Sequence, residues 1–316
     1  MAYLIKKEAF NVFVERIIFK HDVVAPVWDA KDKMSRFTIL KKGEGISGRV
    51  VFELPLYPAK DFFVPRKESF YQFEGDKIKD KAFGKNRKTV FMMNRCDING
   101  VHRNDLIMFT DPIDPYYKEK RENSILIEIP CRQNQYCNCA NIELIDYYDL
   151  KIMELDDHYA IHAANEKGEL LLREIGIVLE HIDYTPFAEK EFKQKQLQTD
   201  NKEVWQKYGT DCFSCSACTV VCPTCMCFTI GCSLNLDCRS GDMHREWASC
   251  QLQEFTKVAG GNVFRKDRGA RGKQRIHCKF LYFKEKFGHE RCVGCGRCNA
   301  ACPVGINIYE YYAQLK

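Results

Sequence analysis

One cysteine spacing, present twice in the last third of the chain, constrains the fold more than any other feature. Each copy reads C-x-x-C-x-x-C-x-x-x-C-P, so three thiols recur at every third residue and a fourth stands just before a proline. Two copies of the same long pattern are far more specific than one. The copies are Cys212, Cys215, Cys218 and Cys222, and Cys292, Cys295, Cys298 and Cys302.

This run of cysteines is typical of domains that bind two [4Fe–4S] clusters. Three thiolates of one copy hold one cubane, and the fourth cysteine ligates the other cluster. Zinc is the alternative, but zinc motifs use two close pairs of ligands rather than three evenly spaced thiols and a fourth. The pattern therefore assigns Cys212, Cys215, Cys218 and Cys302 to one cluster, and Cys292, Cys295, Cys298 and Cys222 to the other.

The composition is that of a globular protein with unusually many cysteines. The 316 residues leave room for two domains, and the apolar fraction of 45% is ordinary. The eighteen cysteines indicate a reducing compartment, because cluster ligands must be thiolates. The first residues include Glu8 and Glu15 and resemble no signal peptide, and no apolar run approaches the roughly 18 residues of a membrane span. We therefore expect a soluble, cytoplasmic protein.

The net charge of +5 is unevenly distributed. Residues 206–316 contain sixteen Lys and Arg against nine Asp and Glu, so the rest of the chain is slightly acidic. A basic run can bind nucleic acid, but iron–sulfur clusters are themselves anionic and nearby cations stabilise them. We favour cluster support or partner docking over a solvated face or nucleic acid. The basic residues concerned are Arg265, Lys266, Arg268, Arg271, Lys273, Arg275 and Lys279.

The first two hundred residues have the pattern of an α/β domain. Apolar residues at helical spacing predict a helix over residues 1–20, and short apolar runs predict strands at 23–27, 37–40 and 50–54. The glycines at 43–48 match a dinucleotide fingerprint, but a strand-like run follows where the fingerprint requires a helix, so we interpret them as a turn. Further strands are expected at 89–93, 124–129, 150–155 and 159–163, with a helix after the first of these that extends to Phe109.

The domain boundary is expected in the Lys- and Gln-rich segment 189–207. Thr185 with Pro186, and Asp200 with Glu203, carry the signals of helix starts there. The two motifs lie about 70 residues apart, further than compact ferredoxins need, and the residues between them predict helices over 243–258 and 275–287. The fold class is therefore α+β, with an α/β domain at 1–205 followed by a helical, ferredoxin-type two-[4Fe–4S] domain at 206–316.

Four cysteines of the first domain form a second candidate site. Cys96 follows the strand at 89–93, Cys131 follows the strand at 124–129, and Cys137 and Cys139 come just after. If these strands are parallel neighbours, their thiols emerge at one edge of the sheet. A third iron–sulfur site is the favoured interpretation, with free thiols or zinc as alternatives.

The remaining cysteines give weaker signals. Ligation by Cys225, Cys227 and Cys250 stays open, and Cys232, Cys238 and Cys278 are interpreted as buried thiols.

The strings around Cys96, around Cys137 and Cys139, around Cys250 and within the two cysteine runs carry a resemblance to known proteins. They resemble the iron–sulfur electron-transfer subunit of anaerobic sulfite reductase and its relative, the β subunit of sulfhydrogenase. The resemblance runs from about Ala25 to the end of the chain. Trp247-Ala-Ser-Cys250 and the Phe264-Arg265 pair are closer to the sulfite reductase branch, whereas Cys278 departs from the family pattern. The other strings are Arg95-Cys96-Asp97, Cys131 with Cys137-Asn138-Cys139, Cys222-Pro-Thr-Cys225-Met-Cys227, Val258-Ala-Gly-Gly261 and Cys292-Val-Gly-Cys295-Gly-Arg-Cys298.

The resemblance implies a division of labour within a larger complex. An FAD-containing flavoprotein would oxidise NAD(P)H, this chain would relay single electrons, and a third protein would reduce sulfite to sulfide at sirohaem, or act at a nickel–iron site. It also implies that Cys96, Cys131, Cys137 and Cys139 correspond to the family's N-terminal cysteines. No membrane or nucleic-acid partner is expected, and we expect no catalytic residues in this chain. A self-contained redox enzyme and a purely structural metal protein are the rival interpretations.

Overall fold

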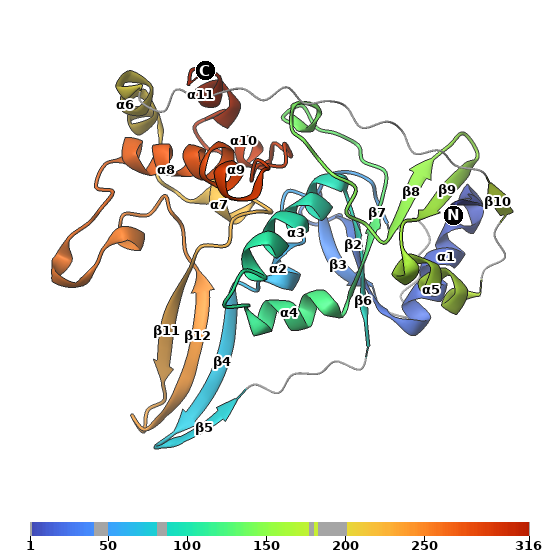
Figure 1. The fold of residues 1–316 in the computed structure, drawn as a ribbon, viewed down its shortest axis with the longest axis horizontal. Helices are drawn as coiled ribbons and strands as arrows, with labels where there is room; N and C mark the ends of the chain where they lie inside the picture. Colours follow the sequence, from blue (N-terminus) through green and yellow to red (C-terminus); the bar gives the residue numbers. More distant parts are fainter. Residues whose placement is uncertain (1, 41–49, 81–86, 177–179, 183–200, 316) are drawn as a thin grey trace.

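The computed structural model describes residues 2–40, 50–80, 87–176, 180–182 and 201–315. Its largest element is an eight-stranded mixed sheet in the order β10-β1-β9-β8-β7-β6-β2-β3 (Figure 1). The central strands β2, β6, β7 and β8 are parallel, and every pairing outside them is antiparallel. The strands are β1 (Ala2–Lys6), β2 (Asp22–Asp29), β3 (Met34–Leu40), β6 (Thr89–Met93), β7 (Ser124–Glu128), β8 (Leu150–Glu154), β9 (His158–Ala163) and β10 (Glu180–Ile182).

Helices cover both faces of this sheet, and β6 and β7 at its centre are accordingly buried on both faces. Successive side chains of a strand point to opposite faces, so Val90 and Met92 join one core while Phe91 and Met93 join the other. The first core is completed by α1 (Phe10–Lys20) and α5 (Glu166–Ile175). The second is completed by α2 (Lys60–Phe63), α3 (Arg95–Met108) and α4 (Pro115–Glu122).

Most of the predicted elements of this domain are confirmed, and two differ. The helix expected over 1–20 begins only at Phe10, because residues 2–6 form β1 and pair with β9 and β10. Residues 50–54 form isolated bridges, at Val50 and Glu53, instead of a strand. The expected turn at 43–48, the helix start at Thr185 and Asp200 itself lie outside the described residues. The helix expected to follow Asp200 is α6 (Lys202–Asp211), and its N-cap is Asn201, whose side chain accepts from the amide of Val204.

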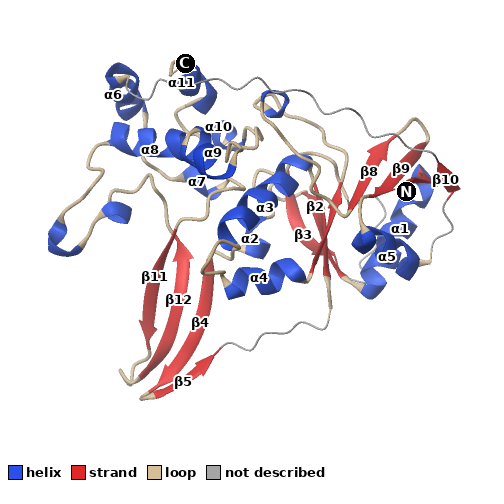
Figure 2. Cartoon of the chain, in the orientation of Figure 1, coloured by secondary structure: helices blue, strands red, loops and turns tan. Residues whose placement is uncertain are grey.

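A second sheet of four antiparallel strands, in the order β11-β12-β4-β5, projects away from the body of the molecule (Figure 2). Its strands are β4 (Lys67–Glu74), β5 (Lys77–Asp80), β11 (Phe228–Leu234) and β12 (Ser240–Trp247). The helix predicted over 243–258 is therefore wrong. Residues 240–246 pair with β4, which is more than 160 residues away in the sequence, and this tertiary pairing overrides the local helical preference.

The C-terminal part is built from short helices around the cysteine motifs. Val204 and Tyr208 of α6 share a core with Ile276 of α8, and Gly272 lies so close to the Tyr208 ring that an added Cβ would stand 2.2 Å from it. The helix expected at 275–287 is instead two helices that meet at Leu281. The helices are α6 (Lys202–Asp211), α7 (Ala217–Val220), α8 (Arg268–Phe280), α9 (Tyr282–Phe287), α10 (Arg297–Ala300) and α11 (Ile308–Ala313).

Buried arginines join the two parts of the chain. Arg103, Arg245 and Arg297 are the three largest fully buried side chains among the described residues. Arg103, on α3, donates from Nε to the carbonyl of Glu290 at 2.9 Å. Each of these arginines has partners on the other side of the predicted boundary, so the two parts are packed firmly together.

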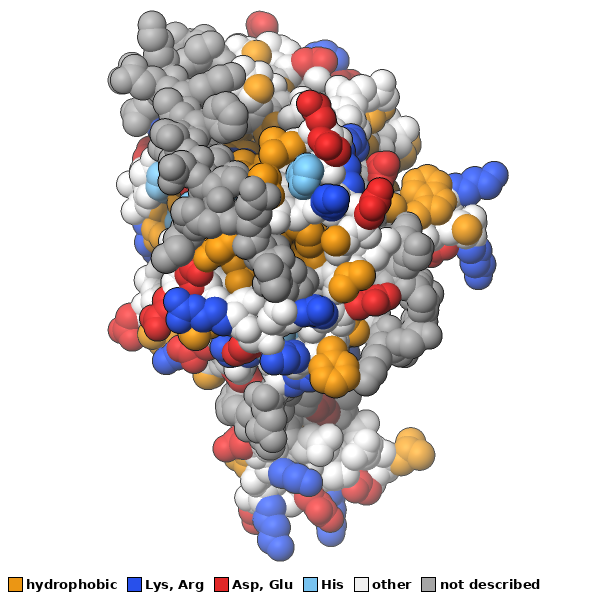
Figure 3. All heavy atoms as spheres, turned by 90° about the vertical axis from the view of Figure 1, so that its right-hand side faces the viewer, with side chains coloured by type: hydrophobic (Ala, Val, Ile, Leu, Met, Phe, Trp, Pro, Cys, Tyr) orange, Lys and Arg blue, Asp and Glu red, His pale blue; other side chains and the backbone are white. Residues whose placement is uncertain are grey.

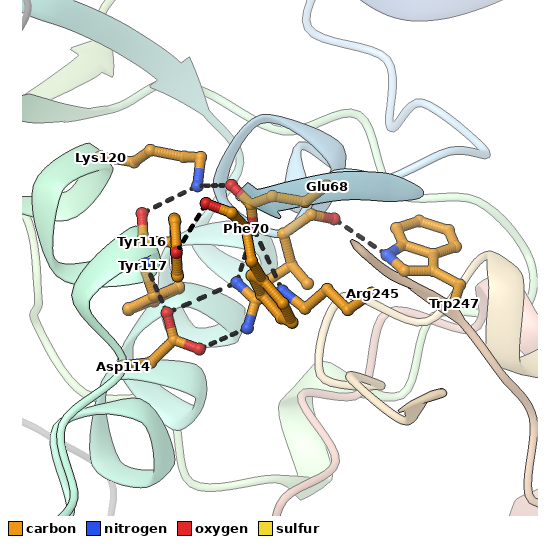
Figure 4. A network of polar contacts seen from close by, with 9 residues as sticks. Glu68, Phe70, Asp114, Tyr116, Tyr117, Lys120, Arg245 and Trp247 are labelled. Atoms are coloured by element: carbon orange, nitrogen blue, oxygen red, sulfur yellow. Dashed lines mark hydrogen bonds and ion pairs between the residues drawn. The ribbon is translucent and has the colours of Figure 1, made fainter. Parts of the chain in front are cut away.

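Arg245 anchors the projecting sheet (Figure 4). It lies on β12 and donates to the Glu68 carboxylate of β4 at 2.6 Å and to Asp114, which caps α4. Lys120 of α4 also pairs with Glu68. The indole of Trp247, two residues further along β12, donates to the Val64 carbonyl at 2.9 Å. The base of the projecting sheet is therefore fixed to the α/β domain.

The surface at the end of the large sheet carries charges of both signs. Figure 3 shows acidic and basic side chains interspersed on this face, with apolar groups between them. This agrees with the nearly balanced charge of the first 205 residues. In the described ranges, no helix has the length and apolar character that a membrane crossing would need.

Candidate metal centres

The two cysteine motifs fold with the same backbone. Ser214 and Ser216 of the first copy have φ of 57° and 69°, and Gly294 and Gly296 at the equivalent positions of the second have 68° and 69°. Glycine adopts this left-handed conformation readily, whereas serine does so at a cost. In both copies, a short helix, α7 or α10, follows the second of these residues. The repeat in the sequence is therefore also a repeat in the structure.

The thiols assigned to the first cluster line one hollow. Cys302 lies there with the three cysteines of the first copy, although more than eighty residues separate it from them. Backbone N–H groups point at two of the sulfurs, because Ser214 donates to Cys212 Sγ and Ile306 to Cys302 Sγ, both at 3.3 Å. The hollow therefore brings together the four thiols that the spacing assigns to one cluster, and Cys298 of the other set also lines it.

The thiols assigned to the second cluster also interact with one another. Burial raises the pKa of Cys292 to about 11 and the pKa of Cys295 and Cys298 to about 12. The negative charge of Cys222, from the first copy, contributes to all three shifts. Cys222 is therefore near the three cysteines of the second copy.

The donors present fit iron–sulfur clusters. Thiols with such raised pKa values would be protonated at neutral pH, and coordination to a metal is what deprotonates a thiol in such a place. Across the described ranges, no three His, Cys, Asp or Glu side chains form a group that could hold a single metal ion. The first thiol set surrounds a hollow instead.

Helix α8 turns its basic residues towards these thiols. Arg271, Arg275 and Lys279 are spaced four residues apart, so they share one face of the helix, and all three are buried. Arg271 donates to Ser214 Oγ at 3.1 Å, and Arg275 to the Cys218 carbonyl at 2.9 Å. These three basic residues therefore lie against the loops that carry the cysteines. This agrees with cluster support, one of the two roles that we favoured for the basic run.

The four cysteines of the α/β domain lie together. Strands β6 and β7 are parallel neighbours, which was the condition for the expected grouping, so Cys96 and Cys131 emerge at the same edge of the sheet. With Cys137 and Cys139 they line a single cavity of about 360 Å³. Burial raises the pKa of Cys96 well above its usual value. Partial burial and the charges of Cys137 and Cys139 raise the pKa of the more exposed Cys131 to about 12. Cys295, from the second ferredoxin motif, lines the same cavity.

The loop that carries Cys137 and Cys139 packs directly on the second motif. The amide of Asn138 donates to the Gly294 carbonyl at 2.7 Å, and Cys137 Sγ lies 3.7 Å from the Cys295 carbonyl. A Cβ added to Gly294 would stand 2.4 Å from the Cys139 Cα. The absence of a side chain at Gly294 therefore permits both the left-handed turn of the second motif and the close approach of the Cys137–Cys139 loop.

Replacing Gly294 by alanine should separate the two loops. Gly305 provides a matched control, because its φ is 69° and an added Cβ would meet nothing within 4 Å. Both substitutions force alanine into a left-handed conformation, at a cost of about 1–2 kcal/mol. Gly294→Ala should lower the free energy of unfolding by about 1–3 kcal/mol more, through overpacking. Anaerobic thermal unfolding measures the difference, and equal losses would contradict it.

Sequence reasoning missed the ion pair that locks these loops in place. The guanidinium of Arg297 donates to both Asp97 oxygens, at 2.9 and 2.6 Å, and to the Pro55 carbonyl at 2.7 Å. Its side chain is 1% exposed and that of Asp97 is 2% exposed. Asp97 stands next to Cys96 in the sequence, and Arg297 stands between Cys295 and Cys298. These adjacencies were the signal available, but nothing in the sequence indicated that the two residues pair.

Comparison with known proteins agrees with this geometry. The family described as a 4Fe-4S dicluster domain matches residues 211–306. The chain is 29% identical over 282 residues to sulfhydrogenase 2 subunit beta of Pyrococcus furiosus, covering 83% of each protein. It is 26% identical over 129 residues to the F420-dependent formate dehydrogenase subunit beta of Methanocaldococcus jannaschii, covering 40% of this chain and 26% of that protein. No solved structure matches.

The dicluster match and the repeated loops confirm the predicted fold class. In this chain, an N-terminal α/β sheet domain is followed by a ferredoxin-type 4Fe-4S dicluster domain at residues 211–306. The chain is a homologue of sulfhydrogenase 2 subunit beta.

Proposed function

We propose that this chain is the iron–sulfur electron-transfer subunit of an oxidoreductase complex, located between a flavoprotein that oxidises NAD(P)H and a separate terminal subunit. The observation that carries the proposal is the position of Cys295, which belongs to the second ligand set and also lines the cavity of the N-terminal cysteines. Cys298 of the second set likewise lines the hollow of the first. The three thiol sets are therefore contiguous, which is what a relay needs.

We infer that Cys96, Cys131, Cys137 and Cys139 hold a third iron–sulfur cluster. The single cavity that they line supports this, as does the place of Cys96 in the first turn of α3, where the helix dipole favours negative charge. Clusters bound at these thiols would store single electrons, at potentials set by hydrogen bonds, charge and exposure. The cavity wall carries the cations of Arg95 and Lys151, and both pair with the Glu128 carboxylate of the same wall, at 3.7 and 3.3 Å.

The terminal subunit that we favour is a sirohaem protein that reduces sulfite to sulfide. The support is the string Trp247-Ala-Ser-Cys250 with the Phe264-Arg265 pair, which resembles the sulfite reductase branch. The second candidate is a sulfhydrogenase with a nickel–iron terminal site. The similarity to sulfhydrogenase 2 subunit beta over 83% of both chains favours this candidate.

We place the complex in a reducing, cytoplasmic compartment. None of the eighteen cysteines forms a disulfide, and Cys232 and Cys238 are exposed, so the interpretation of these two as buried thiols is wrong. Exposed thiols in such numbers persist where disulfides are kept reduced. A boundary near residue 205 remains our proposal for the two domains, although α6 extends across it from Lys202 to Asp211.

Anaerobic isolation of the native complex tests the proposed function. The complex would be purified through a tag on this chain, and its optical spectrum, flavin and metals would be measured. Sirohaem bands together with flavin would support the sulfite reductase assignment, and nickel with flavin and no sirohaem would support the sulfhydrogenase assignment. A chain that is isolated alone and turns over a substrate by itself would contradict both, and would give the N-terminal cysteines a catalytic role.

A further inference from the structure

Four cysteines outside the three ligand sets gather beside the first ferredoxin motif. Cys225 follows that motif directly, and its amide donates to the Cys222 carbonyl at 3.3 Å. Cys227 stands at the start of β11, and its carbonyl accepts from Ala248 at 2.8 Å, which brings the segment of Cys250 alongside. Cys278 approaches from α8, three residues after Arg275, whose guanidinium lies 3.5 Å from Cys225 Sγ. The four cysteines therefore come from three segments that lie side by side: the loop after the first motif, the end of the β11–β12 hairpin, and helix α8.

The electrostatics indicate that these thiols lie near one another. Burial raises the pKa of Cys227, and the charges of Cys250 and Cys278 raise it further. Arg291 connects the group, because its Nη1 lies 3.1 Å from Cys278 Sγ. Cys225 and Cys227 also line one cavity, of about 230 Å³, together with Ala248.

The cations around these thiols have no acidic partner. Arg275 and Lys279 are 3% and 2% exposed, and in the described part of the chain no carboxylate lies within ion-pair distance of Arg275, Lys279 or Arg291. Lys279 donates to the Thr224 hydroxyl at 2.6 Å, and the buried Nε of Arg291 has no hydrogen-bond partner at all. Buried positive charge is costly unless an anion balances it. The thiolates of the ferredoxin motifs supply part of the negative charge that these cations need. The thiols around Arg291, however, do not belong to the ferredoxin ligand sets.

We propose that Cys225, Cys227, Cys250 and Cys278 ligate a further iron–sulfur cluster. Four thiolates around iron and sulfide would supply the negative charge that Arg291 and Lys279 require. The Cys-x-Cys spacing of Cys225 and Cys227 is also that of Cys137 and Cys139 in the proposed third site. The cluster would extend the proposed relay on the side of β11 and β12, but its presence depends only on the four thiols and the cations around them.

Iron analysis of the full chain tests the proposal. Protein prepared anaerobically should contain roughly 16 iron and 16 sulfide per chain if this site and the third site both hold cubanes. The double variant Cys227→Ser/Cys278→Ser should lose roughly four of each, or roughly two if this cluster is of the [2Fe–2S] type. The matched control is Cys232→Ser/Cys238→Ser, which removes two exposed thiols of the same hairpin region and should lose none.

Several outcomes would overturn the proposal. The first is an unchanged iron content in the Cys227→Ser/Cys278→Ser variant, and the second is zinc in place of iron at these thiols. The third is a content of roughly eight iron per wild-type chain, which would exclude the cluster without any variant. Loss of both ferredoxin signals in low-temperature EPR would mean that the double variant misfolds, and Cys250→Ser alone would then decide by the same iron count. The result is independent of the proposed function, because that is judged by the partners and spectrum of the native complex.

Discussion

Replacing Arg297 by methionine will lower the free energy of unfolding by about 3–5 kcal/mol, because it leaves the Asp97 carboxylate buried without its cation. The loss would appear as a fall of roughly 6–20 °C in the midpoint of anaerobic thermal unfolding, at roughly 2–4 °C per kcal/mol. Three hydrogen bonds are removed at once, two to Asp97 and one to the Pro55 carbonyl. These bonds connect α10 with α3, so the second ferredoxin motif should also loosen from the N-terminal cysteines.

Two further variants show whether burial is the cause. Lys118→Met removes an exposed ion pair with Glu122 on α4, at 3.7 Å, and should change stability by no more than about 0.5 kcal/mol. Asp97→Leu combined with Arg297→Met removes both buried charges and should recover part of the loss. Scans must share one heating rate, since unfolding of cluster proteins is often irreversible. A loss below about 1 kcal/mol in Arg297→Met would show that the pair is not an anchor.

The elements that local patterns specify were predictable from the sequence. Strands β6 and β7 are buried almost completely on both faces, and the bounds of β6, after which Cys96 emerges, were predicted to the residue. The doubled cysteine spacing predicted the dicluster domain because this spacing is typical of domains that bind two [4Fe–4S] clusters. The grouping of Cys96 with Cys131 followed from a general rule, that parallel neighbours end at the same edge.

The features that long-range contacts specify were not predictable. Residues 243–246 have helical preferences, but β4 pairs with them and places Arg245 opposite Glu68. Residues 2–6 continue a helical pattern, yet they complete the large sheet. Cys278 showed no spacing that relates it to Cys227, because only the packing of α8 brings the two near each other. In each case, the partner lies many residues away and leaves no local trace in the sequence.

Replacing Cys137 and Cys139 by serine should remove the proposed third cluster and with it most of the electron delivery through the chain. The double variant should lose roughly four iron and four sulfide per chain and retain both ferredoxin clusters. It removes two of the four thiols of a cavity whose wall includes Cys295 of the second ligand set. In the native complex, NAD(P)H-dependent reduction of the terminal acceptor should nearly cease, whereas reduction of the ferredoxin clusters by dithionite should continue.

The comparison needs a variant that loses thiols without losing the relay, and Cys232→Ser/Cys238→Ser provides it because both thiols are exposed. This control should keep its iron and its NAD(P)H-dependent activity. If Cys137→Ser/Cys139→Ser lost iron but kept full activity, the third site would be a structural cluster beside the path, and the flavoprotein would have to deliver electrons directly to the dicluster domain. If it kept its iron, these cysteines would hold no cluster, and the cavity beside Cys295 would need another occupant.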